Sequence, residues 1–120
     1  MTILIIDDDK ECLLLLSQSI SKRGFKVHKA LNGLAALTIL SENKVDLIIS
    51  DVVMFSTPIM SLTCTLKNLY PNVPLILISG FSTSPLIENS LILGADKFIP
   101  KPINTKTLVN AINKLIMVPG

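Results

Sequence analysis

Near its start the sequence reads Ile3-Leu4-Ile5-Ile6-Asp7-Asp8-Asp9, in which four apolar residues lead directly into three carboxylates. An uninterrupted apolar run of this length is typical of a β-strand covered on both faces, as the strands of parallel sheets are. A second, largely apolar run, from Val45 to Ser50, leads into Asp51. The two segments predict buried parallel strands that each end at an acidic group.

Outward from these strands, short β-branched runs alternate with longer patterns of helical spacing along the whole chain. This alternation is typical of an α/β fold, in which helices cover a parallel sheet. No linker, repeat or low-complexity tract divides residues 1–120, so we expect a single domain. The predicted strands are 3–6, 25–28, 45–50, 74–79 and 97–100, and the predicted helices are 10–23, 34–41, one starting near 57–58, 84–94 and 104–117.

The composition favours a folded, cytoplasmic protein. Of the 120 residues, 49% are hydrophobic and 17% charged, which is enough apolar material for a packed core. A net charge of +2 without a run of Lys or Arg gives no support to direct nucleic-acid binding. No apolar segment is long enough to cross a membrane, and Asp7 to Asp9 interrupt the first apolar run too early for a signal peptide.

The two cysteines, Cys12 and Cys64, each lie in a stretch of helical pattern and have no CxxC or histidine neighbour. A disulfide or a shared metal ion remains open for them. Two buried, reduced thiols are the favoured interpretation.

Polar residues follow four of the predicted strands: Asp7 with Asp8, then Asp51, Ser79 and Lys101. In open parallel sheets the ligand site lies beyond the carboxyl ends of the strands, so we expect these side chains to meet there. Carboxylate oxygens suit Mg²⁺, and a lysine and a hydroxyl suit the oxygens of a phosphoryl group. The pattern therefore indicates magnesium-assisted phosphoryl chemistry.

Each of these residues also has an ordinary structural interpretation. A carboxylate after a strand is often a helix N-cap, which is our expectation for Asp9 before Lys10. Ser-Gly and Lys-Pro pairs are common in turns. The occurrence of such residues at four strand ends favours a functional site over four separate turns.

With these segments, the chain resembles the receiver domain of bacterial two-component response regulators over essentially its whole length. Ser79 follows Asp51 by 28 residues and Lys101 follows it by 50, which are spacings typical of that family. Four weak motifs in the right order make a specific combination. They are residues 3–9, residues 46–54, Ile78-Ser79-Gly80, and residues 94–102, which read Gly-Ala-Asp-Lys-Phe-Ile-Pro-Lys-Pro.

The resemblance implies a flavodoxin-like (βα)5 three-layer sandwich with a five-stranded sheet of order 2-1-3-4-5. It implies that Asp51 is phosphorylated by a sensor histidine kinase or a phosphotransfer protein. It also implies Mg²⁺ bound by Asp7, Asp8, Asp51 and the backbone carbonyl of Val53. Ser79 and Lys101 would then contact the phosphoryl oxygens, and a downstream effector protein or a fused output domain would respond in a phosphorelay.

The resemblance further implies a conformational switch, in which Ser79 moves toward the phosphoryl group and Phe98 rotates inward. An ordinary core role for Phe98 is about equally well supported. Three more residues are expected to flank the site: Met54, Phe81 and Pro102. Because Val53 and Phe81 are apolar, they would exclude attacking water, and we expect a long-lived phosphoryl group.

The segment after Met54 departs from the family pattern, because Phe55 and Ile59 stand where Pro and Gly are usual. Thr57-Pro58 is a candidate N-cap and first turn for the helix that follows. Four apolar residues in this region form either an exposed partner surface or, the slightly favoured alternative, part of the core: Phe55, Ile59, Met60 and Phe81.

The leading functional hypothesis is a phosphoacceptor switch, not an enzyme acting on an outside substrate. A receiver-like module that only binds a partner is one alternative. A small phosphohydrolase using the same carboxylates is another, although the sequence offers it no good general acid or base.

Overall fold

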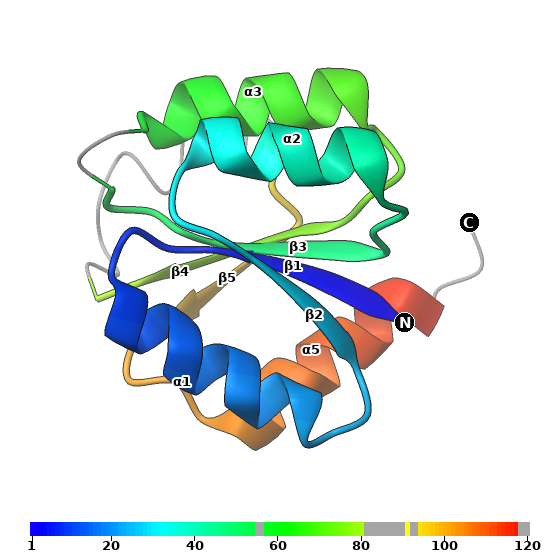
Figure 1. The fold of residues 1–120 in the computed structure, drawn as a ribbon. Coiled ribbons are helices and arrows are strands. Elements are labelled where there is room, and N and C mark those ends of the chain that lie inside the picture. The colour runs from blue at the N-terminus through cyan, green and yellow to red at the C-terminus, as the bar shows by residue number, and fades with distance from the viewer. Residues whose placement is uncertain (55–56, 81–90, 92–93, 118–120) are drawn as a thin grey trace.

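The computed structural model (Figure 1) describes residues 1–54, 57–80, 91 and 94–117. The strands are β1 (Thr2–Ile6), β2 (Lys26–Ala30), β3 (Leu47–Asp51), β4 (Leu75–Ser79) and β5 (Lys97–Pro100). The helices within the described ranges are α1 (Lys10–Ser21), α2 (Gly33–Glu42), α3 (Ile59–Leu69) and α5 (Thr105–Met117). The predicted helix at 84–94 falls almost wholly outside the described residues.

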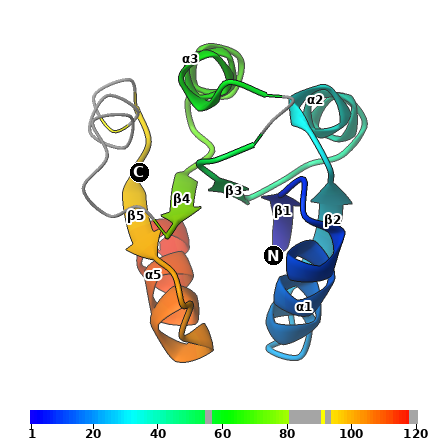
Figure 2. The same ribbon diagram turned by 90° about the vertical axis from the view of Figure 1, so that its left-hand side faces the viewer.

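The five strands form one sheet of order β2-β1-β3-β4-β5, and every neighbouring pair is parallel. Helices α2 and α3 cover one face and helices α1 and α5 cover the other, as Figures 1 and 2 show. The expected flavodoxin-like three-layer arrangement and its strand order are confirmed. Strands β2 and β5 form the two edges of the sheet.

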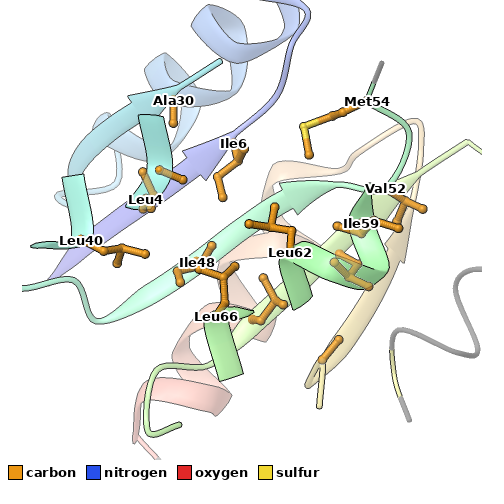
Figure 3. Packing of buried hydrophobic residues seen from close by; sticks show 14 of the residues in the cluster. Leu4, Ile6, Ala30, Leu40, Ile48, Val52, Met54, Ile59, Leu62 and Leu66 are labelled. Carbon is orange, nitrogen blue, oxygen red and sulfur yellow. The ribbon is translucent and has the colours of Figure 1, made fainter. Parts of the chain in front are cut away.

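Each face of the sheet has its own hydrophobic core. Alternate residues of a strand point to opposite faces, so Leu4 and Ile6 pack under α2 and α3 while Ile3 and Ile5 pack over α1 and α5. Figure 3 shows the first cluster, where Leu62 and Leu66 of α3 lie over the sheet. The fully apolar strands of the sequence are therefore explained by burial on both sides.

Helices α1 and α2 begin at side-chain caps, as does α5, where Asn104 Oδ1 accepts from the N–H of Lys106 at 2.9 Å. The Asp9 carboxylate accepts hydrogen bonds from the backbone N–H groups of Glu11 and Cys12, which confirms it as the N-cap of α1. Asn32 Oδ1 accepts from the N–H of Ala35 at 2.8 Å, so α2 begins at Gly33, one residue earlier than predicted. All three caps lie in loops that leave the carboxyl ends of strands.

The N-cap predicted at Thr57 is wrong. Helix α3 begins at Ile59, its N-cap is Pro58, and no side chain bonds to its first turn. The Thr57 hydroxyl instead accepts a hydrogen bond from the N–H of Gly33 at 2.9 Å. Thr57 therefore accepts a hydrogen bond from one of the N–H groups at the start of α2 that have no partner within the helix, and it connects the loop after β3 to α2.

The burial predicted for the cysteines is also wrong, because Cys12 and Cys64 are both free and exposed. Ile59 is buried and Met60 half-buried, in agreement with the favoured core interpretation for these two residues, whereas Phe55 and Phe81 lie outside the described residues. Strand β3 begins at Leu47 instead of Val45, and the Asp46 carboxylate before it accepts the N–H of Thr2 at 2.8 Å. Among the described residues, no helix is long and apolar enough to cross a membrane.

Candidate functional site

The polar residues singled out in the sequence lie together at the carboxyl ends of the strands, which we call the carboxyl edge of the sheet. Asp7 and Asp8 follow β1, Asp51 ends β3, Ser79 ends β4 and Lys101 follows β5. Because β1, β3, β4 and β5 are neighbours and parallel, their carboxyl ends stand side by side, as the arrowheads in Figure 2 show. This arrangement is the one that creates a ligand site in open parallel sheets.

Asp51 and Lys101 form the central ion pair of this edge. Lys101 Nζ lies 3.2 Å from Asp51 Oδ2, with side-chain exposures of 33% and 11%. The other oxygen, Asp51 Oδ1, accepts the backbone N–H of Val53 at 3.3 Å. The aspartate is thus held by its own loop while its second oxygen faces the lysine.

Lys101 is placed by both backbone and charge. Its N–H donates to the carbonyl of Ser79 at 2.9 Å, and a cis peptide bond joins it to Pro102. Burial lowers the pKa of Lys101, but the charge of Asp51 and the hydrogen bond to it outweigh burial, so that the pKa is raised overall. The side chain therefore remains a cation at neutral pH.

Asp7 is the most buried carboxylate of the site, with 5% exposure. Burial raises its pKa, and the nearby charges of Asp51 and Asp8 add to this effect. The N–H of Asp9, which donates to Asp7 Oδ1 at 3.0 Å, and the charge of Lys101 act in the opposite direction. The net rise shows that burial, helped by the two neighbouring carboxylates, outweighs these two effects.

A pocket of about 260 Å³ opens over these residues, and Asp7, Asp51 and Lys101 line its polar side. Its other wall is largely apolar and comes from α1 and from the residues after β5: Cys12, Leu15, Leu16, Pro102 and Ile103 among them. The site thus combines charged groups with a largely apolar wall.

Cys12 is a pocket residue that the sequence analysis missed. Its thiol donates to Asp9 Oδ2 at 3.3 Å, and this hydrogen bond raises the pKa of Cys12. The thiol is thus kept protonated beside the pocket. The sequence did contain a signal for this contact: Cys12 lies three residues after the N-cap Asp9, and residues at positions i and i+3 lie on the same side of a helix.

The donors present are suited to Mg²⁺. Within residues 1–54, 57–80, 91 and 94–117, no three or more His, Cys, Asp or Glu side chains are grouped closely enough to hold a metal by themselves. Magnesium does not require such a cage, since it usually takes one or two carboxylates and keeps several waters. Asp7 is a buried carboxylate that lines the pocket together with Asp51, and a cation bound there would stabilise its charged form.

The remaining predicted site residues occupy different surroundings. Ser79 is buried, with 1% exposure, and Val53 is exposed. Phe98 is half-buried and packs against the core under α2 and α3. Met54 was expected to flank the site, but its side chain is buried in that same core (Figure 3), and Phe81 lies outside the described residues.

Comparison with known proteins identifies the family to which this fold and site belong. The family model described as "response regulator receiver domain" matches residues 3–113. The chain belongs to this family. Its receiver fold is also that of a two-component response regulator from Clostridium difficile, with a TM-score of 0.92 at 24% identity over 98% of this chain and 97% of that one.

Two curated relatives carry a receiver domain of this kind within much longer chains. The DNA-binding transcriptional regulator NtrC of Bradyrhizobium sp. (strain RP501 Parasponia) is 30% identical over 98% of this chain and 25% of its own length. The sensor kinase CckA of Brucella abortus (strain 2308) is 30% identical over 96% of this chain and 12% of its own. The receiver domain thus spans a quarter or less of these relatives.

Proposed function

We propose that this receiver domain is a magnesium-dependent phosphorylation switch in which Asp51 is the phosphoacceptor. The observation that carries the proposal is the placement of Asp51, whose one oxygen lies 3.2 Å from Lys101 Nζ in a pocket shared with buried Asp7. An ion-paired carboxylate beside a second, buried carboxylate is suited to a cation-assisted reaction with a phosphoryl group. Sensor histidine kinases or phosphotransfer proteins are the donors we infer from family membership.

In the proposed reaction, a carboxylate oxygen of Asp51 attacks the phosphorus of a phosphohistidine. The new O–P bond forms as the N–P bond breaks, and the imidazole leaves with the electron pair of that bond and takes up a proton from solvent. The Lys101 ammonium stabilises charge on the phosphoryl oxygens throughout, because it remains protonated beside Asp51. The apolar wall of α1 limits access of competing water.

Asp7, Asp8, Asp51 and the carbonyl of Val53 are the groups we assign to Mg²⁺. The cation supplies charge neutralisation between the carboxylates and the phosphoryl oxygens. Asp7 would be one of its ligands, since burial and the hydrogen bond from the Asp9 N–H hold this carboxylate in place in the wall of the pocket. Asp8 is less buried and stands nearer solvent.

The readout we propose passes through Ser79 and Phe98. A phosphoryl dianion on Asp51 attracts the Ser79 hydroxyl from the end of the neighbouring strand. Space vacated there is available to Phe98, whose ring has no hydroxyl and therefore acts through packing alone. A downstream effector or a fused output domain would then bind the altered surface.

Mass spectrometry after incubation with acetyl phosphate and Mg²⁺ tests the proposal. We expect the mass of one phosphoryl group to be added, and Asp51→Asn to abolish the addition. Asp46→Asn is the matched control, because Asp46 is a partly buried carboxylate that accepts the Thr2 N–H at the opposite end of the strands. An unmodified wild-type protein would instead favour the partner-binding module that is not phosphorylated. A label that persists in Asp51→Asn would overturn the assignment of Asp51 as the phosphoacceptor.

A further inference from the structure

Helix α1 presents different residues on its two flanks. Cys12, Leu15 and Leu16 line the phosphorylation pocket on the flank toward α5. The opposite flank faces the edge strand β2 and contributes a separate set of residues: Lys10, Leu14, Ser17, Gln18, Ser21 and Lys22. Figure 2 shows α1 lying beneath β2 at one edge of the sheet.

Two neighbouring hollows follow this second flank, with volumes of about 470 and 380 Å³. Leu14 and Lys29 line both hollows, so the two form one continuous surface. We call it the α1–β2 groove and define it by five residues: Lys10, Leu14, Lys22, Lys29 and Leu31. It lies outside the pocket that holds Asp51.

The α1–β2 groove combines apolar and basic side chains. Leu14 and Leu31 are 47% and 37% exposed, which is unusual for leucines side by side in a hollow. Three lysines line the groove together with these leucines, and no Asp or Glu is among the described residues that line it. The two ion pairs found within the described ranges involve other lysines, at positions 67 and 101. The groove therefore offers uncompensated positive charge around an apolar strip.

The edge of β2 adds backbone groups to this surface. The Lys26 N–H donates to Met1, and the Ala30 carbonyl accepts from the Asp7 N–H, so these two residues direct their backbone toward β1. In a parallel strand the alternate residues face the other way, which directs the N–H and C=O groups of Val27 and Lys29 away from β1. The side chains of Val27 and Lys29 line the groove as well.

We propose that the α1–β2 groove binds an extended, acidic segment of a partner protein that carries leucine-like side chains. Its backbone would pair with the free edge of β2, its apolar side chains would cover Leu14 and Leu31, and its carboxylates would meet the lysines. A second copy of this chain is disfavoured, because pairing two β2 edges sets Lys29 near the same lysine of the other copy. Nucleic acid is disfavoured because the floor of the groove is aliphatic and offers no ring for base stacking.

The groove is separate from the proposed phosphorylation site, so the inference does not depend on it. α1 lies between the two surfaces, and a segment bound along β2 leaves Asp51 and Lys101 accessible. Binding here would therefore hold the domain to a partner without blocking its pocket.

The test is an NMR titration of the whole ¹⁵N-labelled chain with a soluble synthetic peptide of alternating Leu and Glu. Amide shifts are expected to concentrate in residues 10–22 and 26–31. The same peptide with every Glu replaced by Gln is expected to bind about tenfold more weakly, because it lacks the charge that faces the lysines.

Variants of the chain locate the binding. Lys29→Glu and Leu14→Ser are each expected to weaken binding of the peptide by about fivefold. Lys97→Glu is the matched control: Lys97 is also an exposed lysine on an edge strand, but on β5 at the other side of the sheet, and its variant should bind as the wild type does.

Several results would overturn the proposal. One is the lack of any localised shift at peptide concentrations up to about 1 mM. Another is equal weakening by Lys97→Glu, which would indicate general attraction to a basic protein. A third is preferential binding of a single-stranded oligonucleotide at the same amides, and a fourth is self-association of the free chain through β2.

Discussion

The contact between Gly33 and Thr57 allows a quantitative test of how the loop after Asp51 is held. A methyl group added at Gly33 would lie 2.7 Å from Thr57 Cγ2 and 3.2 Å from Leu62 Cδ1. The first distance is too short for carbon atoms in contact, so the loop must shift. The second involves the far end of a leucine, which can rotate aside.

The change in the free energy of unfolding caused by Gly33→Ala is the sum of two opposing contributions. Replacing glycine by alanine within a helix stabilises it by up to about 1 kcal/mol. Overpacking usually costs about 1–3 kcal/mol, and the 2.7 Å contact places Gly33→Ala well within this range. We therefore expect Gly33→Ala to lower the free energy of unfolding by about 1 kcal/mol net.

Thr57→Ser provides the rescue. It removes the obstructing methyl group but keeps the hydroxyl that accepts the Gly33 N–H at 2.9 Å. Alone it should cost about 0.8 kcal/mol, the value of one buried methyl group. In the double variant the overlap is gone, so the stabilities should depart from additivity by about 1–2 kcal/mol in the favourable direction.

Urea unfolding followed by circular dichroism measures all four proteins of this cycle. Gly24→Ala is the control, because Gly24 has a φ of 93° and no atom within 4 Å of an added Cβ. Its cost comes from backbone conformation and should add to that of Thr57→Ser. Additivity within about 0.5 kcal/mol in the Gly33–Thr57 cycle would refute the contact.

Three further predictions address the charges and polar groups of the domain. Asp7→Asn should raise stability without metal by about 1 kcal/mol by removing a buried charge. Because the pKa of Asp7 is raised above 3.8 in the folded protein, Asp7 contributes favourably to the free energy of unfolding below pH 3.8, and this contribution is lost as the pH rises through the folded pKa. Urea unfolding at a series of pH values should show a smaller loss of stability over this range in Asp7→Asn than in the wild type. Thr63→Val should stabilise by about 1 kcal/mol in thermal unfolding, because the buried Thr63 hydroxyl has no partner in the described part of the chain. Val53→Glu should shorten the lifetime of the phosphoryl group on isolated protein about tenfold by placing a polar group near attacking water; an unchanged decay rate would contradict the proposed role of apolar flanks.

The sequence predicted the sheet and the position of the site because both depend on simple patterns. Fully apolar strands require cover on both faces, and parallel order then brings the residues after β1, β3, β4 and β5 to one edge. The ion pair between Asp51 and Lys101 follows from this order, although 50 residues separate the two in sequence.

The environment of the cysteines could not be predicted in the same way, because it depends on the rotational phase of each helix. In the sequence of α1, Leu13, Leu16 and Ile20 follow one another at helical spacing. In the structure the buried residues are Leu13, Ser17 and Ile20, and Leu16 is half-buried against the same core. Ser17 is tolerated there because its hydroxyl donates to the Leu13 carbonyl at 2.6 Å. A buried, satisfied serine conceals the true face and leaves Cys12 exposed.

The bond between Thr57 and Gly33 was hidden for a different reason. It joins a loop to a helix start 24 residues away, and neither residue type requires the other. Thr57-Pro58 has the composition of a helix cap, and only the approach of α2 decides that the hydroxyl is used elsewhere. The local sequence therefore identified Thr57 as a hydrogen-bonding residue but assigned it to the wrong helix.

The three consecutive aspartates show how position alone separates chemical roles. Asp7 is buried with a raised pKa, while Asp9 is exposed with a pKa lowered first by the Cys12 N–H and then by its thiol. The two are connected, because the Asp9 N–H donates to Asp7 while the Asp9 carboxylate caps α1. A change of charge at Asp7 therefore acts directly on the first residue that holds α1. α1 forms a wall of the phosphorylation pocket on one flank and of the α1–β2 groove on the other, so Asp7 and Asp9 lie at the start of the helix that both surfaces share.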